Sequence, residues 1–173
     1  MQKNAVRTKT VVYVAMLIAL NIVIVRFLSI QTPVIRVGFG FLTTSLCSML
    51  FGPVIGGISA FAADFLGMAV NSRGMAYFPG FGISEALYGV TYALFLFHRD
   101  KSYKNIISCV LLQMLFIDLL LGMLWVHMMV ETPLWTIFSS RGINALILAP
   151  IKIFGIKYLW KYVGINLSIN NER

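Results

Sequence analysis

The sequence predicts an all-α, polytopic membrane protein: a six-transmembrane-helix bundle with its N and C termini cytoplasmic. Three observations lead to this class. First, 59% of the 173 residues are apolar and only 12% are charged, whereas soluble domains are about one quarter charged. Second, a single soluble core in a chain of this length could not bury so much apolar surface. Third, polar breaks divide the chain into apolar stretches, and a helix needs about 20 apolar residues to cross the hydrocarbon layer.

Each predicted span lies between breaks that are polar or rich in Pro and Gly. The breaks occur at 31–33, 51–57, 71–80, 98–104 and 129–133. Gly52-Pro53 should form a turn between the short second and third spans, and Pro150 should kink or divide the last span. No cleavable signal peptide is expected, because no small-x-small pattern follows the first apolar stretch. The spans are expected at 10–30, 38–51, 53–70, 81–97, 105–128 and 134–162, and one integral membrane domain accounts for residues 1–173.

The distribution of positive charge predicts the orientation. If the chain crosses six times, ten of the 14 Lys and Arg residues fall on the side of both termini. The positive-inside rule then places both termini in the cytoplasm. Membrane topology therefore explains the net charge of +8 better than nucleic-acid binding does. The ten are Lys3, Arg7, Lys9, Arg99, Lys101, Lys104, Lys152, Lys157, Lys161 and Arg173, and the other four are Arg26, Arg36, Arg73 and Arg141.

Several ionisable residues fall within the predicted spans or at their ends, where a charge costs at least ~3 kcal/mol on insertion scales. Arg26, Asp64 and Arg141, with Asn144 one turn beyond, are expected at similar depth toward the outer side. This arrangement suggests a pocket that opens outward. Two structural alternatives stay open: Arg26 snorkels to the interface, or Asp64 is the ion-pair partner of Arg26 or Arg141. The complete set is Arg26, Asp64, Glu85, Asp118, Arg141 and Lys152.

The remaining members of this set carry weaker expectations. Glu85 should open the fourth span, where the helix dipole favours an anion, so a structural role is expected. Lys152 either sets topology or reaches into the cavity. Asp118 has no matching cation nearby in sequence and receives no role. No metal site is expected, because Cys47 and Cys109 have no CxxC or His-rich context.

A segment rich in aromatic residues, Pro and Gly is expected to join the third and fourth spans on the outer side. Its fixed bends and projecting rings favour a stacking site for a flat ligand. An aromatic belt at the membrane interface is the alternative. The segment is Tyr77-Phe78-Pro79-Gly80-Phe81-Gly82, and Phe39, Phe41, Trp125 and Trp135 are further aromatics at outer span ends.

The first span carries two small residues four positions apart, Ala15 and Ala19. They lie on one helix face, and small residues at this spacing allow another helix to approach closely. The pattern predicts a shallow groove for a partner helix.

Together these residues resemble the substrate-binding subunit, or S component, of energy-coupling-factor (ECF) transporters, and most closely its folate-specific members. The resemblance extends over nearly the whole chain. Its most specific part is Phe78-Pro79-Gly80-Phe81 after a third span that contains Asp64; the following Gly82 stands where family members commonly have Thr. The other matching elements are Ala15-xxx-Ala19, Arg26-Phe27, Gly38-Phe39, Phe51-Gly52-Pro53 with Gly56-Gly57, and Arg141.

The resemblance implies high-affinity folate binding at an outward-facing pocket and delivery of folate into the cell by an ATP-driven importer. The implied partners are a membrane-embedded coupling (T) subunit and two ATPase subunits in the lipid bilayer, and no cofactor or nucleic acid is implied. The implied location is the cell membrane of a Gram-positive bacterium. The chain lacks a Walker A sequence, so ATP hydrolysis is assigned to the partners and no enzymatic activity is expected. Segment 30–37 resembles the family's first loop, and the predicted lid residues are Gln31, Pro33, Arg36 and Phe39, while Ala15 and Ala19 would face the coupling subunit.

The chemistry of folate matches the candidate residues. Asp64 could accept hydrogen bonds from the pterin, aromatic rings could stack on it, and Arg26, Arg141 or Lys152 could pair with the glutamate carboxylates. Which polar group meets which end of folate stays open. The predicted substrate-binding residues are Arg26, Asp64, Tyr77, Phe78, Pro79, Gly80, Phe81, Trp125, Arg141, Asn144 and Lys152.

Other function classes fit the sequence less well. An S component for another flat vitamin or a pyrimidine precursor is the nearest alternative. A membrane-embedded enzyme would need clustered Asp residues for a metal or a Ser/His pair at matching depth, and the sequence shows neither. A channel or structural assembly factor would lack an occluded pocket.

Overall fold

The computed structural model describes residues 2–31, 36–72, 77–129 and 133–164. Within these ranges the regular secondary structure is helical apart from one short strand pair, in which Ile30 pairs with Val37 and Gln31 with Arg36. Its elements are α1 (Gln2–Phe27), β1 (Ile30–Gln31), β2 (Arg36–Val37), α2 (Gly40–Val70), α3 (Pro79–Leu96), α4 (Tyr103–Leu112), the π-helix η1 (Gln113–Leu121), α5 (Gly122–Met129), α6 (Leu134–Leu159) and the π-helix η2 (Trp160–Gly164).

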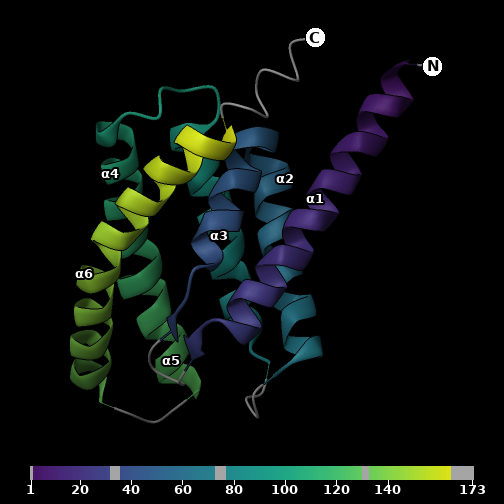
Figure 1. Ribbon diagram of the computed structural model, residues 1–173. Helices are drawn as coiled ribbons and strands as arrows, with labels where there is room; N and C mark the ends of the chain where they lie inside the picture. Colours follow the sequence, from purple (N-terminus) through teal and green to yellow (C-terminus); the bar gives the residue numbers. More distant parts are fainter. Residues whose placement is uncertain (1, 32–35, 73–76, 130–132, 165–173) are drawn as a thin grey trace.

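The helices form a bundle in which α1 leans against α2 on one side, and α4, α5 and α6 lie on the other (Figure 1). The helices α4, η1 and α5 follow one another without a gap from Tyr103 to Met129. The beginning of α1 and the π-helix η2 lie at one end of the molecule, whereas the β1–β2 pair and α5 lie at the opposite end (Figure 1).

Among the described residues, four helical stretches are long and apolar enough to cross a membrane: Thr8–Phe27, Gly40–Val70, Tyr103–Met129 and Leu134–Tyr162. Large apolar side chains cover their outer surfaces, and Val54 and Phe154 are 70% and 67% exposed. So much exposed apolar surface suits contact with lipid. The chain is therefore a multi-pass helical membrane protein, as its composition predicts.

The continuous assignment of α2 conceals a sharp break at Gly52. This residue has φ 84° and ψ −177° inside an otherwise helical stretch. Glycine adopts a positive φ without the steric cost of a Cβ atom. The next residue, Pro53, occupies a first-turn position, where its missing N–H would have no helical partner. Two helical segments thus meet at the predicted Gly52-Pro53 turn.

Glycine also controls how closely α2 and α3 pack. A Cβ atom on Gly89 would lie 2.3 Å from the carbonyl oxygen of Gly56, so no larger residue fits there without moving the backbone. Small residues allow this close approach of membrane helices. Beside this contact, side chains from α2, α3, α4 and α6 form the buried core: Met49, Tyr92, Leu96, Ile106, Cys109, Val110 and Ile156.

The structure corrects two predictions about α3. The helix begins at Pro79, so Pro79 to Gly82 form its first turn rather than a loop. Proline is favoured at this position because its fixed φ suits a helix start. Glu85 consequently lies beyond the first turn, which holds no acidic residue. The expected role of Glu85 at the helix N-terminus is therefore wrong, since the dipole effect fades beyond the first turn.

The other boundaries differ by a few residues. The first helix begins at Gln2 and ends at Phe27 rather than covering 10–30, and α2 begins at Gly40 rather than 38. α6 continues through Pro150 without dividing, and its upper part leans over the ends of the other helices (Figure 1). Of the residues named above, Pro33, Arg73 and Arg173 lie outside the described ranges.

Candidate functional site

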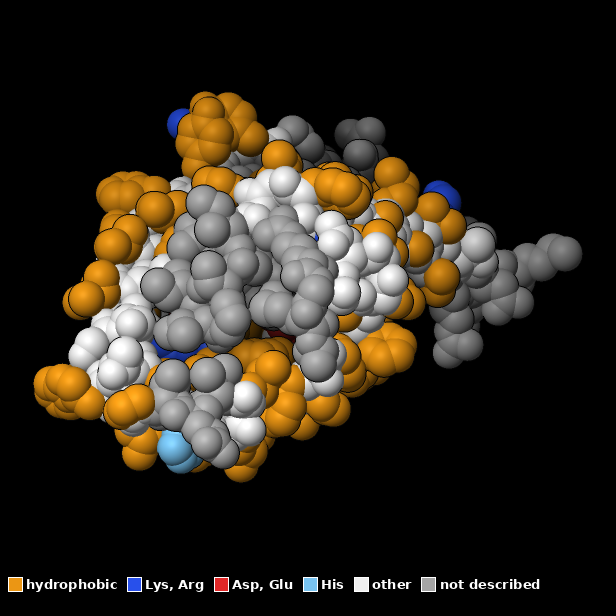
Figure 2. All heavy atoms as spheres, turned by 90° about the horizontal axis from the view of Figure 1, so that it is seen from below, with side chains coloured by type: hydrophobic (Ala, Val, Ile, Leu, Met, Phe, Trp, Pro, Cys, Tyr) orange, Lys and Arg blue, Asp and Glu red, His pale blue; other side chains and the backbone are white. Residues whose placement is uncertain are grey.

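A cavity of about 150 Å³ lies between α1, α2, α3, η1 and α6. Its wall combines acidic, basic, amide and aromatic side chains with small apolar residues. Seen from the end that holds β1, β2 and α5, apolar side chains form the rim of the molecule, and acidic and basic atoms are visible toward the middle (Figure 2). The polar and aromatic lining residues include Asp64, Glu85, Asp118, Arg141, Lys152, Asn21, Asn144, Phe41, Phe81, Tyr88 and Tyr92.

A buried ion pair joins α1 to α2 at one wall of the cavity. The Nη2 atom of Arg26 donates to the Asp64 carbonyl oxygen at 3.1 Å and lies 3.4 Å from Oδ1 of the same residue. Nη1 of Arg26 lies 3.2 Å from the Met68 sulfur. The side chains of Arg26 and Asp64 are 0% and 4% exposed. Gly67 makes room for the guanidinium, because a Cβ there would lie 2.7 Å from Nε of Arg26.

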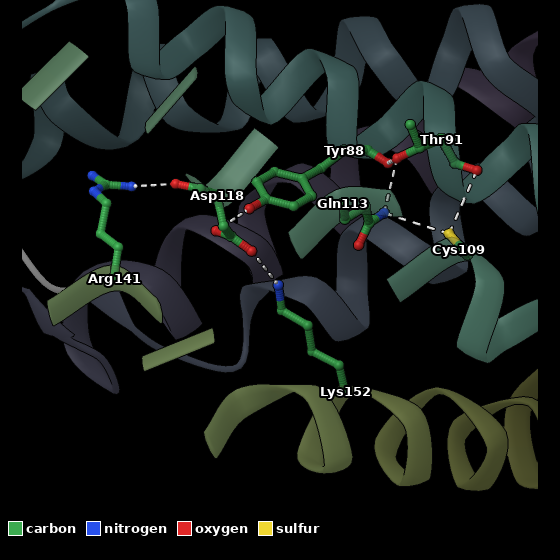
Figure 3. Close-up of polar contacts among 7 residues, drawn as sticks. All are labelled: Tyr88, Thr91, Cys109, Gln113, Asp118, Arg141 and Lys152. Atoms are coloured by element: carbon green, nitrogen blue, oxygen red, sulfur yellow. Dashed lines mark hydrogen bonds and ion pairs between the residues drawn. The ribbon is translucent and has the colours of Figure 1, made fainter. Parts of the chain in front are cut away.

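A second polar cluster surrounds Asp118 on η1 (Figure 3). Its carboxylate accepts a hydrogen bond from the Tyr88 hydroxyl on α3 and lies 3.6 Å from the Lys152 ammonium on α6. The Lys152 nitrogen also lies 4.9 Å from the centre of the Tyr88 ring. The Asp118 carbonyl oxygen accepts a hydrogen bond from Nη1 of Arg141 at 3.3 Å. Asp118 thus connects α3, η1 and α6.

The π-helical stretch η1 begins at another buried polar residue, Gln113. Its side-chain nitrogen donates to the Thr91 hydroxyl on α3 at 2.8 Å and lies 3.5 Å from the Cys109 sulfur (Figure 3). π-helical turns occur frequently at functional sites. Here such a turn holds Asp118 against α3 and α6.

Asn21 positions the beginning of α2, directly after the strand pair. Its amide nitrogen lies 3.2 Å from the Gly40 carbonyl oxygen, 2.7 Å from the Thr43 hydroxyl and 3.0 Å from the Thr44 hydroxyl. These contacts therefore connect α1 to the first turns of α2, which follow the predicted lid segment. Within that segment the structure gives the backbone pairing of Ile30 with Val37 and of Gln31 with Arg36.

The predicted aromatic segment packs against rings of its own and of neighbouring helices. The ring of Phe78 lies 5.7 Å from that of Trp125 and 5.9 Å from that of Phe81. The indole N–H of Trp125 donates to the Ser84 hydroxyl at 3.0 Å. Of these aromatic residues, Phe81 is the one that lines the cavity.

The structure brings many of the predicted binding residues together. Asp64, Phe81, Arg141, Asn144 and Lys152 line the cavity. Arg26 lies directly behind Asp64. The remaining predicted residues are not part of the lining: Tyr77, Phe78, Pro79, Gly80 and Trp125.

Sequence reasoning left important lining residues without a role. Asp118 was considered to lack a cation, yet Lys152 lies 3.6 Å away. The signal was available, because a carboxylate at membrane depth requires a partner and Lys152 was already a candidate for the cavity. Tyr88 and Asn21 gave no comparable signal, since single hydroxyl and amide groups are common in membrane helices.

The residues predicted to meet a partner lie on an open face. Ala15 and Ala19 are both exposed on α1, whereas Asn21 on the same helix lines the cavity. The groove formed by Ala15 and Ala19 is therefore open on the surface of the described part of this chain.

The predicted lid residue Phe39 is 50% exposed at the start of α2.

Comparisons with known proteins agree with this architecture. Residues 9–171 match the family model described as "ECF transporter, substrate-specific component". A protein of Clostridium novyi named folate transporter FolT is 35% identical over 166 residues, which cover 96% of this chain and 95% of that protein. A protein of the same name from Leuconostoc mesenteroides is 34% identical over 157 residues, covering 87% of this chain and 83% of that protein.

Two solved structures are similar to the whole bundle. A crystal structure of FolT bound with folic acid superposes with a TM-score of 0.83 at 31% identity, covering 88% of this chain and 92% of that one. A structure of the S component of a bacterial ECF transporter gives a TM-score of 0.61 at 20% identity, covering 91% and 98% of the two chains. The second similarity concerns the fold alone.

Proposed function

Because this chain belongs to the family of substrate-specific components of ECF transporters, we propose that it binds folate in the cavity beside Asp64 and Asp118 and delivers it into the cell. The observation that carries the proposal is the composition of the cavity wall. Acceptors, cations and aromatic rings surround one space within a single chain. The relatives named for folate transport and the structure that holds folic acid support the same ligand.

Each part of folate has a chemical counterpart in the wall. The pterin is flat and carries hydrogen-bond donors, which suit the Asp64 or Glu85 carboxylate and a ring such as Phe81. The glutamate tail carries two carboxylates, which suit Arg141 and Lys152 on α6. Predicted substrate residues outside the lining, such as Trp125, then support the wall rather than touch the ligand.

We infer a supporting role for Arg26. Its guanidinium is fully buried against Asp64 and Met68, so it holds Asp64 in place rather than receiving the tail. The cavity of about 150 Å³ is smaller than the roughly 300–1,000 Å³ typical of small-molecule sites. Folate entry therefore requires side chains around the cavity to move apart, and the segment between α1 and α2 is the proposed lid.

We infer six crossings, with α2 counted as two segments that meet at Gly52. Two observations support this inference. The beginning of α1 and the π-helix η2 lie at the same end of the molecule (Figure 1), and an excess of Lys and Arg is expected on that side. Both termini are then cytoplasmic, and the whole chain forms one integral membrane domain. We place it in the cell membrane of a Gram-positive bacterium, since both named relatives come from Firmicutes.

Delivery of folate requires partners, because an ECF importer is ATP-driven and this sequence has no Walker A motif. We propose a membrane-embedded coupling subunit and two ATPase subunits. The exposed groove of Ala15 and Ala19 on α1 is the proposed contact with the coupling subunit, since close helix packing favours small residues.

Equilibrium binding by calorimetry tests the ligand. The purified chain should bind folate without ATP and should bind thiamine, riboflavin and biotin far more weakly. Arg141→Ala should weaken folate binding by ~1–3 kcal/mol, because it removes a charge-assisted hydrogen bond, and should barely affect pteroate, which lacks the glutamate. A folded sample that prefers another vitamin would contradict the folate assignment.

The partner contact needs a separate test. Ala15→Trp fills the groove but leaves the cavity unchanged, so folate affinity of the isolated chain should stay at the native value. Co-purification with the coupling and ATPase subunits and ATP-driven uptake should both be lost. Thr8→Trp, an exposed position nearer the helix start, is the control and should retain both. Normal assembly of the Ala15→Trp variant would remove the interface assignment.

A further inference from the structure

A second groove is lined by the start of α4 and the last turns of α6. These segments lie toward the end of the molecule that holds η2 (Figure 1). The groove is open and has a volume of about 860 Å³. Its wall combines apolar and aromatic side chains with two lysines. The lining of this α4–α6 groove includes Tyr103, Ile151, Phe154, Lys157, Tyr158 and Lys161.

The apolar part of the groove faces outward along a membrane-spanning helix. The exposed fractions of Ile151, Phe154 and Tyr158 are 41%, 67% and 66%, respectively. All three belong to the apolar stretch Leu134–Tyr162. In a bilayer this surface would contact lipid chains rather than water.

The basic part of the groove lies beside aromatic rings. The Lys157 ammonium donates to the Lys101 carbonyl oxygen at 2.6 Å and lies 5.1 Å from the centre of the Tyr103 ring. The Lys101 ammonium lies 4.2 Å from the centre of the Trp160 ring. These contacts hold the lysines at the edge of the apolar surface. Tyrosine and tryptophan at such an edge are typical of the membrane interface.

Charge at this edge favours an anionic ligand. Burial lowers the pKa of Lys101, and the negative charge of the neighbouring Asp100 partly opposes this effect. A phosphate near the lysines would favour their charged forms and so oppose this effect of burial. No acidic side chain lines the described wall of the groove.

We propose that the α4–α6 groove binds one anionic phospholipid. Its phosphate lies against Lys157 and Lys161, and one acyl chain lies along Ile151 and Phe154. A free phosphate would pair with the lysines but would leave the apolar wall exposed. A lipid matches both parts, and basic sites between membrane helices on the cytoplasmic side bind anionic headgroups. This site is separate from the folate cavity, and the proposal does not depend on the folate assignment.

Native mass spectrometry of the full chain tests the proposal. The purified protein is mixed with equal amounts of phosphatidylglycerol and phosphatidylcholine that have the same acyl chains, one of them deuterated. The native chain should retain phosphatidylglycerol over phosphatidylcholine by about tenfold. The double variant Lys157→Gln/Lys161→Gln should reduce this preference to about twofold or less.

Arg99→Gln/Lys104→Gln is the matched control. It removes the same net charge from two exposed residues at this end that do not line the groove, so the lipid preference should stay. The free energy of unfolding in detergent, measured on every variant, verifies folding. Equal losses in both double variants would overturn the proposal in favour of general surface charge, and an unchanged preference in the groove variant would overturn it outright. Displacement of the lipid by inorganic phosphate alone would identify a phosphate site instead. Loss of ATPase-module co-purification with unchanged lipid retention would assign the groove to a protein partner.

Discussion

Replacing Arg26 should destabilise the whole bundle rather than remove a contact to the ligand tail. The Arg26 and Asp64 side chains are 0% and 4% exposed, and the nearest ion-pair distance is 3.4 Å. At an effective dielectric constant of about 20, two opposite charges at this distance attract each other by about 5 kcal/mol. The cost of removing both groups from water offsets most of that attraction.

The cost of breaking the pair is larger than its net contribution. Arg26→Ala leaves the Asp64 carboxylate buried without its cation, and breaking a buried pair in this way costs ~3–5 kcal/mol. Arg26→Met with Asp64→Asn removes both charges, so the double variant should recover part of that stability. The non-additive difference gives the coupling between the two residues.

The assay is the free energy of unfolding of the purified chain in detergent, followed by tryptophan fluorescence. Arg99→Ala, which changes an exposed loop residue, should leave that free energy unchanged. Folate and pteroate affinities should fall by the same factor in Arg26→Ala, because both ligands depend on the position of Asp64. Native stability combined with a loss for folate alone would refute the reasoning, since it would mean that Arg26 binds the glutamate.

Three glycines provide further tests. Gly122→Ala should weaken folate binding by about tenfold, because the new Cβ would lie 2.0 Å from Nη1 of Arg141 and would displace that side chain; unchanged calorimetric affinity would argue against a role for Arg141. Gly89→Ala should lower the free energy of unfolding by ~1–3 kcal/mol, because its Cβ would meet the Gly56 backbone; a native unfolding midpoint would contradict the close α2–α3 packing. Gly142→Ala is the control for both, because apart from the adjoining residues and backbone of its own helix no atom lies within 4 Å of the added Cβ. A loss of affinity or stability there would show that any added methyl group is harmful.

The sequence predicted the helix breaks well where a single residue determines the local backbone geometry. The turn at Gly52-Pro53 was predicted because only certain residues tolerate such backbone geometry, and the positive φ of Gly52 confirms it. The start of α3 was predicted too late. An aromatic residue, Pro and Gly in succession indicated a loop, yet Pro79 suits the first turn of a helix equally well. Local composition does not distinguish these two outcomes.

The partner of Asp118 could not be found by the same kind of reasoning. Lys152 lies on another helix, and its distance to Asp118 depends on helix tilt and on the π-helical register of η1. A π-helical turn changes the face on which later residues lie. Hydropathy reports which stretches enter the membrane, but it does not report how helices rotate against each other.

Membrane energetics nevertheless singled out the charged residues of the cavity wall without any of that geometry. Each ionisable residue placed inside a span was costly enough to require a reason. In the structure, five of the six line the same cavity: Asp64, Glu85, Asp118, Arg141 and Lys152. The sixth, Arg26, lies behind Asp64. Lipid is a poor solvent for charge, so charged groups that enter the bilayer gather away from it. The cost of each charge therefore singled out these residues, although the sequence predicted a structural role for Glu85, no role for Asp118, and none of the pairings.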